Sequence, residues 1–362
     1  MARGLSVLAL VTDAFGGYGG IAQYNRDFFQ SLSDSDLVER IEVLPRIAGE
    51  AFGRPPLKVR QCKPRIGRFS YALNAIATAR SRGPFDLVFC GHIYHAPLSA
   101  AIQKMFGGRL WIQTHGVDAW TPPGLLACAA VRHADVIATV SRYTRRKLLE
   151  WAEVCPERVR VLPNTVRPIF SPGPRSEETL AKFGLSNRKV ILTVARLSRA
   201  DIYKGHSRVI EAMARVRLAE PKAVYVIVGD GDGRADIEAL AARLELRDAV
   251  RLVGKVDDVD LLSLYRSADA FIMPSTKEGF GIVFVEAAAA GLPVIAGNRD
   301  GSVDALADGA IGRLIDPMSI DEIGGALLDV LHGRAPIDPH AAQRFSYPNF
   351  ASHVDALLRT LA

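Results

Sequence analysis

The sequence has few cysteines and no long uncharged apolar run. Its four cysteines, Cys62, Cys90, Cys128 and Cys155, include no Cys-x-x-Cys pair, which argues against a zinc site or a disulfide framework. The apolar run Leu5–Val11 is followed closely by Asp13 and is too short for a signal peptide or a membrane span, and no later window is long enough to span a membrane. We therefore expect a cytoplasmic protein with reduced thiols.

Acidic residues are absent from positions 51–85, where eight basic residues occur. Residues 1–170 carry an excess of nine positive charges, whereas residues 171–362 carry an excess of three negative charges. The basic stretch at 51–85 could bind nucleic acid, an anionic membrane or a phosphorylated acceptor, and an ordinary solvated surface is an equally good explanation. Nucleic acid is disfavoured because only Phe69 and Tyr71 supply interleaved aromatic rings. The sequence predicts that residues 54–82 contact an anionic membrane surface, with the protein peripheral on its cytoplasmic face.

Length and periodicity predict two α/β domains. A chain of 362 residues exceeds the usual size of one hydrophobic core, and its apolar runs alternate with helical periodicity, which favours parallel sheets. A Pro/Gly-rich linker is expected near 170–175. Ligands are expected in the cleft between the domains, because open parallel sheets bind them at strand carboxyl ends. The expected strands are 5–12, 41–44, 86–90, 110–113, 136–139 and 159–162, then 190–194, 223–228, 250–252, 270–273, 293–296 and 311–315.

The segment from Pro274 to Ala287 contains the most informative pattern. Glu278 precedes a predicted helix that Gly279, Phe280 and Gly281 open, and Glu286 follows eight residues later. That separation corresponds to roughly 12 Å of helix, whereas a retaining glycosidase pair needs carboxyls about 5 Å apart. The two carboxylates therefore suit opposite ends of one extended ligand, such as a sugar joined to a nucleoside through a diphosphate. Free amides at the helix start also suit an anionic ligand.

Two cations and one acidic pair are candidates for handling a departing diphosphate. Arg196 and Lys204 lie between a predicted strand and the next helix, where a guanidinium fork and a point charge replace a metal ion. The alternative is a divalent ion held by Asp230 and Asp232. Because these two residues lie in a glycine-rich strand-to-helix turn, we expect them to shape the turn and expect no metal.

Glycines and histidines mark the first half. Gly16 and Gly17 follow the first strand, where glycine lets backbone approach a ligand; a plain tight turn is the alternative, and the spacing is not that of a dinucleotide fingerprint. His115 ends a strand and is expected near the transferred sugar. Asp118 either orients its ring or contacts the acceptor, and His92 and His95 are weaker acceptor-side candidates.

Together, several segments resemble the family 4 retaining glycosyltransferases, which have the GT-B fold of two facing, doubly wound Rossmann-like domains. The segment E-G-F-G-I-V-F-V-E-A at 278–287 carries the main resemblance. Asp300-Gly301-Ser302 departs from the family's commoner Gly-Gly-x-x-Glu form, so that loop receives no assigned role. The other matching segments are Gly16-Gly17, Thr114-His115-Gly116, Pro163-Asn164, Arg196 with Lys204-Gly205, Val228-Gly229-Asp230-Gly231 and Val253-Gly254-Lys255-Val256.

The resemblance implies roles for individual residues. An N-terminal acceptor domain would comprise residues 1–168 plus a returning helix in 346–362, and a nucleotide-sugar domain would comprise 169–345. The catalytic residues would be Glu278, His115, Arg196 and Lys204. The donor-binding residues would be Gly16, Gly17, Arg196, Lys204, Gly254, Val256, Gly279, Phe280, Gly281, Ile282 and Glu286.

The implied function is a retaining, metal-independent transfer without a cofactor. A hexose-type sugar would pass from a UDP- or GDP-sugar to a polyprenyl-diphosphate-linked or other saccharide acceptor, in cell-surface polysaccharide or glycolipid assembly. The alternatives are a non-catalytic nucleotide-sugar or membrane-surface binding protein of the same fold, and a sugar-nucleotide epimerase. A phosphorolytic enzyme would need a lysine for pyridoxal phosphate, and no lysine stands out for that role.

Overall fold

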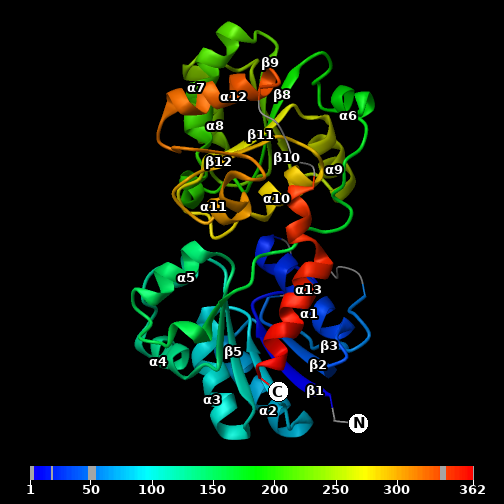
Figure 1. Cartoon of the computed structure of the whole chain (residues 1–362), viewed down its shortest axis with the longest axis vertical. Helices are drawn as coiled ribbons and strands as arrows, with labels where there is room; N and C mark the ends of the chain where they lie inside the picture. The colour runs from blue at the N-terminus through cyan, green and yellow to red at the C-terminus, as the bar shows by residue number, and fades with distance from the viewer. Residues whose placement is uncertain (1–3, 18, 48–53, 335–339, 362) are drawn as a thin grey trace. The chain divides into compact units, whose positions relative to one another are not determined.

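The computed structural model describes residues 4–17, 19–47, 54–334 and 340–361 (Figure 1). Contacts within the chain divide it into two compact units. Unit 1 consists of Met1–Thr165 with Tyr347–Ala362, and unit 2 consists of Val166–Ser346. Each unit is described by itself below.

Unit 1 is built on a seven-stranded parallel sheet in the order β3-β2-β1-β4-β5-β6-β7. The strands are β1 (Leu5–Val11), β2 (Val38–Pro45), β3 (Val59–Gln61), β4 (Leu87–Cys90), β5 (Arg109–Thr114), β6 (Val136–Thr139) and β7 (Val159–Val161). The helices are α1 (Gly20–Asp34), α2 (Arg68–Arg82), α3 (Ala96–Phe106), α4 (Leu125–His133), α5 (Arg142–Leu149) and α13 (Tyr347–Arg359), with 3-10 turns η1 (Ile93–His95), η2 (Val117–Ala119) and η3 (Pro156–Arg158).

Both faces of the unit 1 sheet are covered, which explains why its central strands are almost continuously apolar. On one face, the Phe28 ring of α1 stacks on Phe89 at 4.4 Å and meets Trp111 edge-on at 5.3 Å. The opposite face packs alternate strand residues, such as Leu8 and Leu10, in one buried cluster with residues of α2 and α3. Helix α13, late in the chain, packs against α1 (Figure 1).

Unit 2 is built on a six-stranded parallel sheet in the order β10-β9-β8-β11-β12-β13. The strands are β8 (Lys189–Val194), β9 (Ala223–Val228), β10 (Val250–Gly254), β11 (Ala270–Met273), β12 (Val294–Gly297) and β13 (Arg313–Ile315). The helices are α6 (Glu177–Lys182), α7 (His206–Ala219), α8 (Arg234–Arg243), α9 (Asp258–Ser267), α10 (Ile282–Ala289), α11 (Ser302–Ala305) and α12 (Ile320–Leu331), with 3-10 turns η4 (Arg199–Lys204), η5 (Ala307–Gly309) and η6 (Ala341–Phe345).

Helices also cover both faces of the unit 2 sheet. Strand residues such as Ile191 and Tyr225 share a buried cluster with residues of α7, α8 and α12. On the other face, Phe271 contacts the rings of Tyr265 in α9 at 6.0 Å and Phe284 in α10 at 5.8 Å. Several helices begin at a side-chain N-cap, which satisfies one of the amides left free at a helix start. These caps include Ser141, Ser176, Asp257 and Ser319.

The predicted fold class of two Rossmann-like parallel α/β domains is confirmed. Each of the twelve expected strands is present, and only β3 was missed. This strand is Val59-Arg60-Gln61, whose composition gives no apolar run and which pairs at the sheet edge with β2. Within the described part of the chain, no helix is both long enough and apolar enough to cross a membrane.

Candidate functional site

Each sheet has a switch point, where the chain leaves the middle of the sheet in opposite directions. In unit 2 this point lies between β8 and β11, because β9 and β10 extend to one side and β12 and β13 to the other. In unit 1 it lies between β1 and β4. The loops that leave the carboxyl ends of such neighbouring strands diverge, and open α/β sheets bind ligands in the crevice they leave. The residues predicted from the sequence follow these strands.

An ion pair joins the two loops at the unit 2 switch point. Lys204 ends η4 after β8, and Glu278 lies between β11 and α10. The Lys204 ammonium donates a hydrogen bond to Oε2 of Glu278. The two side chains are only 16% and 17% exposed, so removing either one would leave a poorly solvated charge. The structure therefore brings these two predicted residues into direct contact.

Arg196 is held by a second carboxylate of the same segment. Its Nε lies 2.6 Å from Oδ2 of Asp201, and the Tyr203 hydroxyl donates to Oδ1 of Asp201 at 2.9 Å. Burial by itself would raise the pKa of Asp201, but the hydrogen bonds from Arg196 and Tyr203 lower it below its ordinary value. The Arg196 side chain remains 72% exposed. The guanidinium is thus fixed through Nε by a charged carboxylate, while most of the side chain stays exposed and able to donate to an anion.

Helix α10 begins at Gly281 without any side-chain cap. Gly281 has φ of 87°, and a Cβ there would lie 2.4 Å from the Phe284 ring, so only glycine fits this turn. Phe280 is buried and meets Phe345 edge-on at 5.3 Å. The Phe284 amide donates to the Gly281 carbonyl at 3.0 Å, and the amides of Ile282 and Val283 before it suit an anion or a hydroxyl group, helped by the helix dipole.

Glu286 lies inside α10 and is 6% exposed. The Tyr265 hydroxyl donates to its Oε2 at 3.2 Å, and burial raises the pKa of Tyr265 well above its ordinary value, so the phenol stays protonated as a donor. The carboxylate is therefore fixed by a tyrosine that the sequence pattern did not single out. Its expected role among the donor-binding residues stays a prediction.

Gly254 and Val256 lie farther along the sheet, after the edge strand β10. Gly254 has φ of 77° and its carbonyl accepts from the amide of Gly229 at 2.8 Å, which ties the end of β10 to the end of β9. No hydrogen bond described for the chain joins Val256 to the Lys204–Glu278 pair. Their expected role among the donor-binding residues stays a prediction.

Asp230 and Asp232 serve the turn after β9. Oδ1 of Asp230 accepts from the amide of Gly231 at 2.9 Å, and Oδ1 of Asp232 accepts from the amide of Arg199 at 2.9 Å. The Asp230 contact is local to the turn, whereas the Asp232 contact ties this turn to the start of η4, 33 residues earlier in the chain. Within the described ranges, no group of three or more His, Cys, Asp or Glu side chains is placed to hold a metal ion.

The glycine-rich loop of unit 1 follows β1 at the second switch point. Arg26 of α1 donates to the carbonyls of Ala14 and Gly17 at 3.0 and 2.8 Å. Gln61 at the end of β3 accepts from the Phe15 amide at 3.1 Å and donates to its carbonyl at 2.6 Å. A Cβ on Gly17 would overlap the Asp13 carboxylate. The loop is thus fixed from two sides by residues that the sequence pattern did not reveal.

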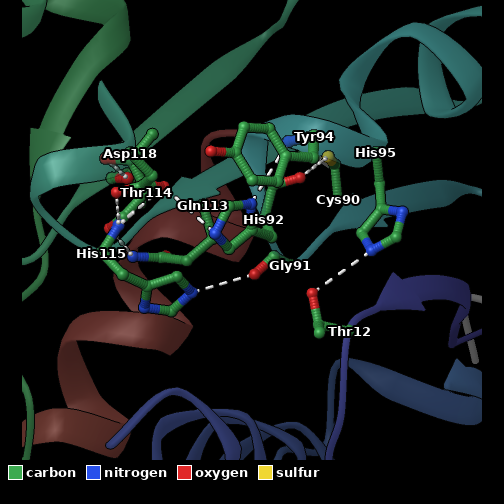
Figure 2. A network of polar contacts seen from close by, with 11 residues as sticks. Thr12, Cys90, Gly91, His92, Tyr94, His95, Gln113, Thr114, His115 and Asp118 are labelled. Atoms are coloured by element: carbon green, nitrogen blue, oxygen red, sulfur yellow. Dashed lines mark hydrogen bonds and ion pairs between the residues drawn. The ribbon is translucent and has the colours of Figure 1, made fainter. Parts of the chain in front are cut away.

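His115 and His92 bridge two neighbouring strand ends of unit 1 (Figure 2). His115 follows β5, and its Nε2 lies 2.9 Å from the carbonyl of Gly91 after β4. The His92 ring, after β4, has its Nε2 4.0 Å from Asp118. Asp118 also accepts from the His115 amide at 3.0 Å. The loop after β4 therefore contacts His115 through the Gly91 carbonyl, and the loop after β5 contacts His92 through Asp118. Asp118 both orients the His92 ring and fixes the backbone of His115.

Hydrogen bonding defines the tautomers of the two rings. A carbonyl can only accept, so His115 Nε2 carries the proton toward Gly91 and Nδ1 is the acceptor. His92 Nδ1 accepts from the Tyr94 amide at 3.3 Å, which places the proton on Nε2. Burial lowers the pKa of both rings, against the raising effect of Asp118. Neutral His115 can thus accept a hydrogen bond from a hydroxyl group.

His95 lies deeper in the same network and differs from the other two. Its Nε2 is 3.4 Å from the Thr12 hydroxyl, and its ring lies 5.3 Å from that of Tyr71 (Figure 2). Burial lowers the pKa of His95 to about 4, with a further lowering by His92. Its contacts are with buried groups of unit 1, which argues for a structural role over the acceptor contact considered from the sequence.

The basic segment, residues 54–82, also exposes large apolar side chains. Leu57 and Phe69 are 103% and 87% exposed, and Ile66 and Leu73 are 73% and 69% exposed. Exposed basic residues occur in the same segment, at positions 54, 60, 63, 65, 68 and 80. An exposed surface that mixes apolar and cationic side chains is typical of contact with an anionic membrane.

Two family models together match most of the chain. The model described as glycosyl transferases group 1 matches residues 176–347, and the model described as glycosyltransferase family 4 matches residues 18–170. The first match contains Arg196, Lys204, Glu278 and Glu286, and the second contains His115.

Curated relatives include two enzymes of related description. One is the GDP-mannose-dependent alpha-(1-6)-phosphatidylinositol monomannoside mannosyltransferase of Mycolicibacterium smegmatis, to which this chain is 29% identical. The match covers 62% of this chain and 61% of the length of that relative. The other is the GDP-mannose-dependent monoacylated alpha-(1-6)-phosphatidylinositol monomannoside mannosyltransferase of Corynebacterium glutamicum. This chain is 25% identical to it, over 91% of this chain and 90% of the relative.

Solved structures share the fold. A crystal structure of Anabaena HepE in complex with UDP and glucose superposes with a TM-score of 0.79 at 22% identity, over 98% of this chain and 100% of that protein. At this identity the likeness concerns the fold.

Proposed function

The chain belongs to family 4 of the glycosyltransferases, and we propose that it transfers a hexose-type sugar from a nucleotide-sugar to a lipid-linked or saccharide acceptor, with retention of configuration and without a metal ion. The observation that carries the proposal is the pair of cations that carboxylates hold in the loop after β8. Lys204 is held by Glu278 and Arg196 by Asp201, at one switch point.

The two cations suit the chemistry of a departing nucleoside diphosphate. Cleavage of the sugar–phosphate bond leaves negative charge on the diphosphate, and preorganised donors stabilise that charge without rearrangement. Arg196 presents a fork and Lys204 a point charge, and both are already oriented by carboxylates. Removing one such contact commonly lowers the rate by about 10²–10³-fold.

Binding of the donor would change the partner of Lys204. In the structure its ammonium donates to Glu278, and a diphosphate would attract the same ammonium. Lys204 has three N–H donors, so it can contact the phosphate and retain Glu278. Glu278 would meanwhile accept from hydroxyls of the transferred sugar.

Retention of configuration is proposed to follow a front-face route. The acceptor hydroxyl would approach from the side of the leaving phosphate, whose oxygen would take its proton. The protein would then contribute orientation and charge stabilisation.

GDP-mannose is the first donor to test, because the relatives from Mycolicibacterium smegmatis and Corynebacterium glutamicum are described as GDP-mannose-dependent. Their described acceptors are phosphatidylinositol mannosides, so a lipid-linked acceptor is the first class to try. The basic segment would hold the protein against the anionic surface in which such an acceptor lies. UDP-sugars remain the second donor class.

The test is release of nucleotide from a panel of GDP-, UDP- and ADP-sugars, with phosphatidylinositol-type and polyprenyl-diphosphate-linked acceptors, in the presence and absence of EDTA. We expect EDTA-resistant turnover of one donor, reduced at least about 100-fold in Lys204→Gln and Glu278→Gln. Lys182→Gln is the control, because Lys182 forms an exposed ion pair with Asp260. Strict dependence on a divalent ion would contradict the metal-independent mechanism. Donor binding by calorimetry without turnover would favour a non-catalytic binding protein.

Membrane contact is tested separately with vesicles. We expect binding to vesicles that contain anionic lipid and weaker binding at high salt. Phe69→Ser should reduce partitioning by roughly 10-fold, since it removes an exposed aromatic ring from the basic segment. Leu125→Ser is the matched control, because Leu125 is 90% exposed but lies outside that segment. Equal losses in the two variants would contradict a role for the basic segment.

A further inference from the structure

Three neighbouring strands of unit 2 contribute loops to the candidate site, and the loop after β12 has no role in the proposal so far. This loop contains Asp300, Gly301 and Ser302. We infer that Asp300 is a positioning residue that fixes Glu278 for its contact with the donor sugar. The inference rests on the proposed function of Glu278.

The Asp300 carboxylate accepts hydrogen bonds from the backbone of two loops, the one that contains Glu278 and its own. Its Oδ2 accepts from the Glu278 amide at 2.6 Å, and its Oδ1 accepts from the Ser302 amide at 2.9 Å. In return, the Gly301 amide donates to the Glu278 carbonyl at 2.8 Å. Glu278 therefore has both its amide and its carbonyl engaged by the same loop, which fixes the peptide planes on either side of its Cα.

Close packing leaves the two loops little freedom to separate or slide. A Cβ on Gly301 would lie 2.0 Å from the Gly279 carbonyl oxygen and 2.8 Å from that of Glu278, so the backbones touch directly. The Glu278 side chain, fixed at its backbone, reaches Lys204 on the other side. A continuous path of contacts thus runs from the loop after β12 through Glu278 to the loop after β8.

The ionic state of Asp300 argues against a role in stability alone. The residue is 1% exposed, and burial raises its pKa to about 6, with the amides of Glu278 and Ser302 acting against that rise. No ion pair with Asp300 is found in the described part of the chain, and its charged neighbour, Glu278, is an acid. A buried carboxylate without a cation is costly to stability, and such groups persist mainly where function requires them.

The experiment compares Asp300→Asn with wild type in the nucleotide-release assay. The amide has the shape of the carboxylate but presents one acceptor oxygen, so one of the two backbone N–H groups loses its partner. We expect kcat/KM for the donor to fall about 10–100-fold, mainly in kcat, because Glu278 is displaced from its reacting position. We expect the thermal midpoint of unit 2 to change little, since removal of the buried charge offsets the loss of one backbone hydrogen bond.

Asp269→Asn is the matched control. Asp269 accepts from the Val190 amide at 2.7 Å but precedes β11, at the end of the sheet opposite to Glu278. This variant should lose stability and keep kcat/KM. In a double-mutant cycle, Asp300→Asn should add less than about 3-fold to the loss already caused by Glu278→Gln, because the first acts through the second.

Hydrogen exchange measures positioning without a substrate. Peptides that span 274–281 should exchange faster in Asp300→Asn, and those of β9 should not change. Asp300→Gly, which removes the side chain with no steric demand, gives the same expectation if the asparagine variant does not fold. Unchanged exchange at 274–281, or full activity in an active enzyme, would overturn the inference. Absence of turnover in wild type would instead contradict the proposed function, while the exchange result would still decide the role of Asp300.

Discussion

Acid should open unit 1 before unit 2, because of His95. This side chain is 6% exposed at the end of η1, the turn that follows β4. Burial lowers its pKa from 6.5 to about 4 in the folded chain. Between these two values the unfolded chain binds a proton that the folded chain excludes. The stabilising contribution is therefore complete above pH 6.5 and is lost as the pH falls toward 4.

The size of the effect follows from the two pKa values. The free energy of unfolding should fall by about 2 kcal/mol between pH 7.5 and pH 5, and by about 3 kcal/mol at pH 4. His92 and His115 lie in the same unit and also have lowered pKa values, so they add to the loss. The free energy of unfolding of unit 1 should accordingly fall by more than the amount that His95 alone contributes.

Unit 2 contains groups of opposite sign. Burial lowers the pKa of His206 to about 4, which gives the same loss as His95. The pKa of Asp300 is raised from 3.8 to about 6, so the folded chain takes up a proton first as the pH falls. That uptake should return about 1.4 kcal/mol by pH 5, against the loss of about 2 kcal/mol from His206. The two effects largely offset, and unit 2 should change little.

Hydrogen exchange at pH 7.5 and pH 5, corrected for the intrinsic rate at each pH, measures each unit separately. Peptides of β4 and β5 should lose protection in wild type, and His95→Gln should remove about 2 kcal/mol of that pH dependence. His353→Gln is the control, since His353 lies exposed on α13 of the same unit. Equal pH dependence in wild type and His95→Gln would refute the reasoning.

Three further predictions concern single substitutions. Gly229→Ala should lower the free energy of unfolding of unit 2 by about 2–4 kcal/mol in denaturant titration, because φ is 139° and the new Cβ would lie 2.0 Å from the Ala195 carbonyl oxygen. Tyr265→Phe should raise the donor KM about 3–10-fold at nearly constant kcat, because Glu286 loses the hydroxyl that donates to it. Asp118→Asn should destabilise unit 1 by about 1–2 kcal/mol in the same titration, because a backbone amide and His92 lose a charged acceptor.

The sequence predicted the sheets well because buried parallel strands are read directly from apolar runs. It failed at β3, where a three-residue edge strand carries Arg60 and Gln61 between its one apolar residue and the following loop. Such a strand is defined by its pairing with β2, which no local pattern reveals.

The charged residues of the candidate site could be predicted from the sequence, but the residues that hydrogen-bond to them and fix their positions could not. Lys204 and Glu278 were each placed after a strand from the apolar runs, and the structure shows that these strands are neighbours and that the two side chains meet. Asp201 and Tyr265 were missed because their roles depend on which side chain lies opposite them in space. Asp300 was seen but could receive no role, since its partner is the backbone of a residue 22 positions away.

Gln61 gives the basic segment a mechanical link to the glycine-rich loop. Its two hydrogen bonds to Phe15 make the end of β3 and the start of that loop one rigid joint. A membrane that orders residues 54–82 would then also order the loop before Gly16, and a ligand that tightens the loop would strengthen the hold on the membrane by the same factor. Membrane attachment and ligand binding would then be thermodynamically coupled, each raising the affinity of the other.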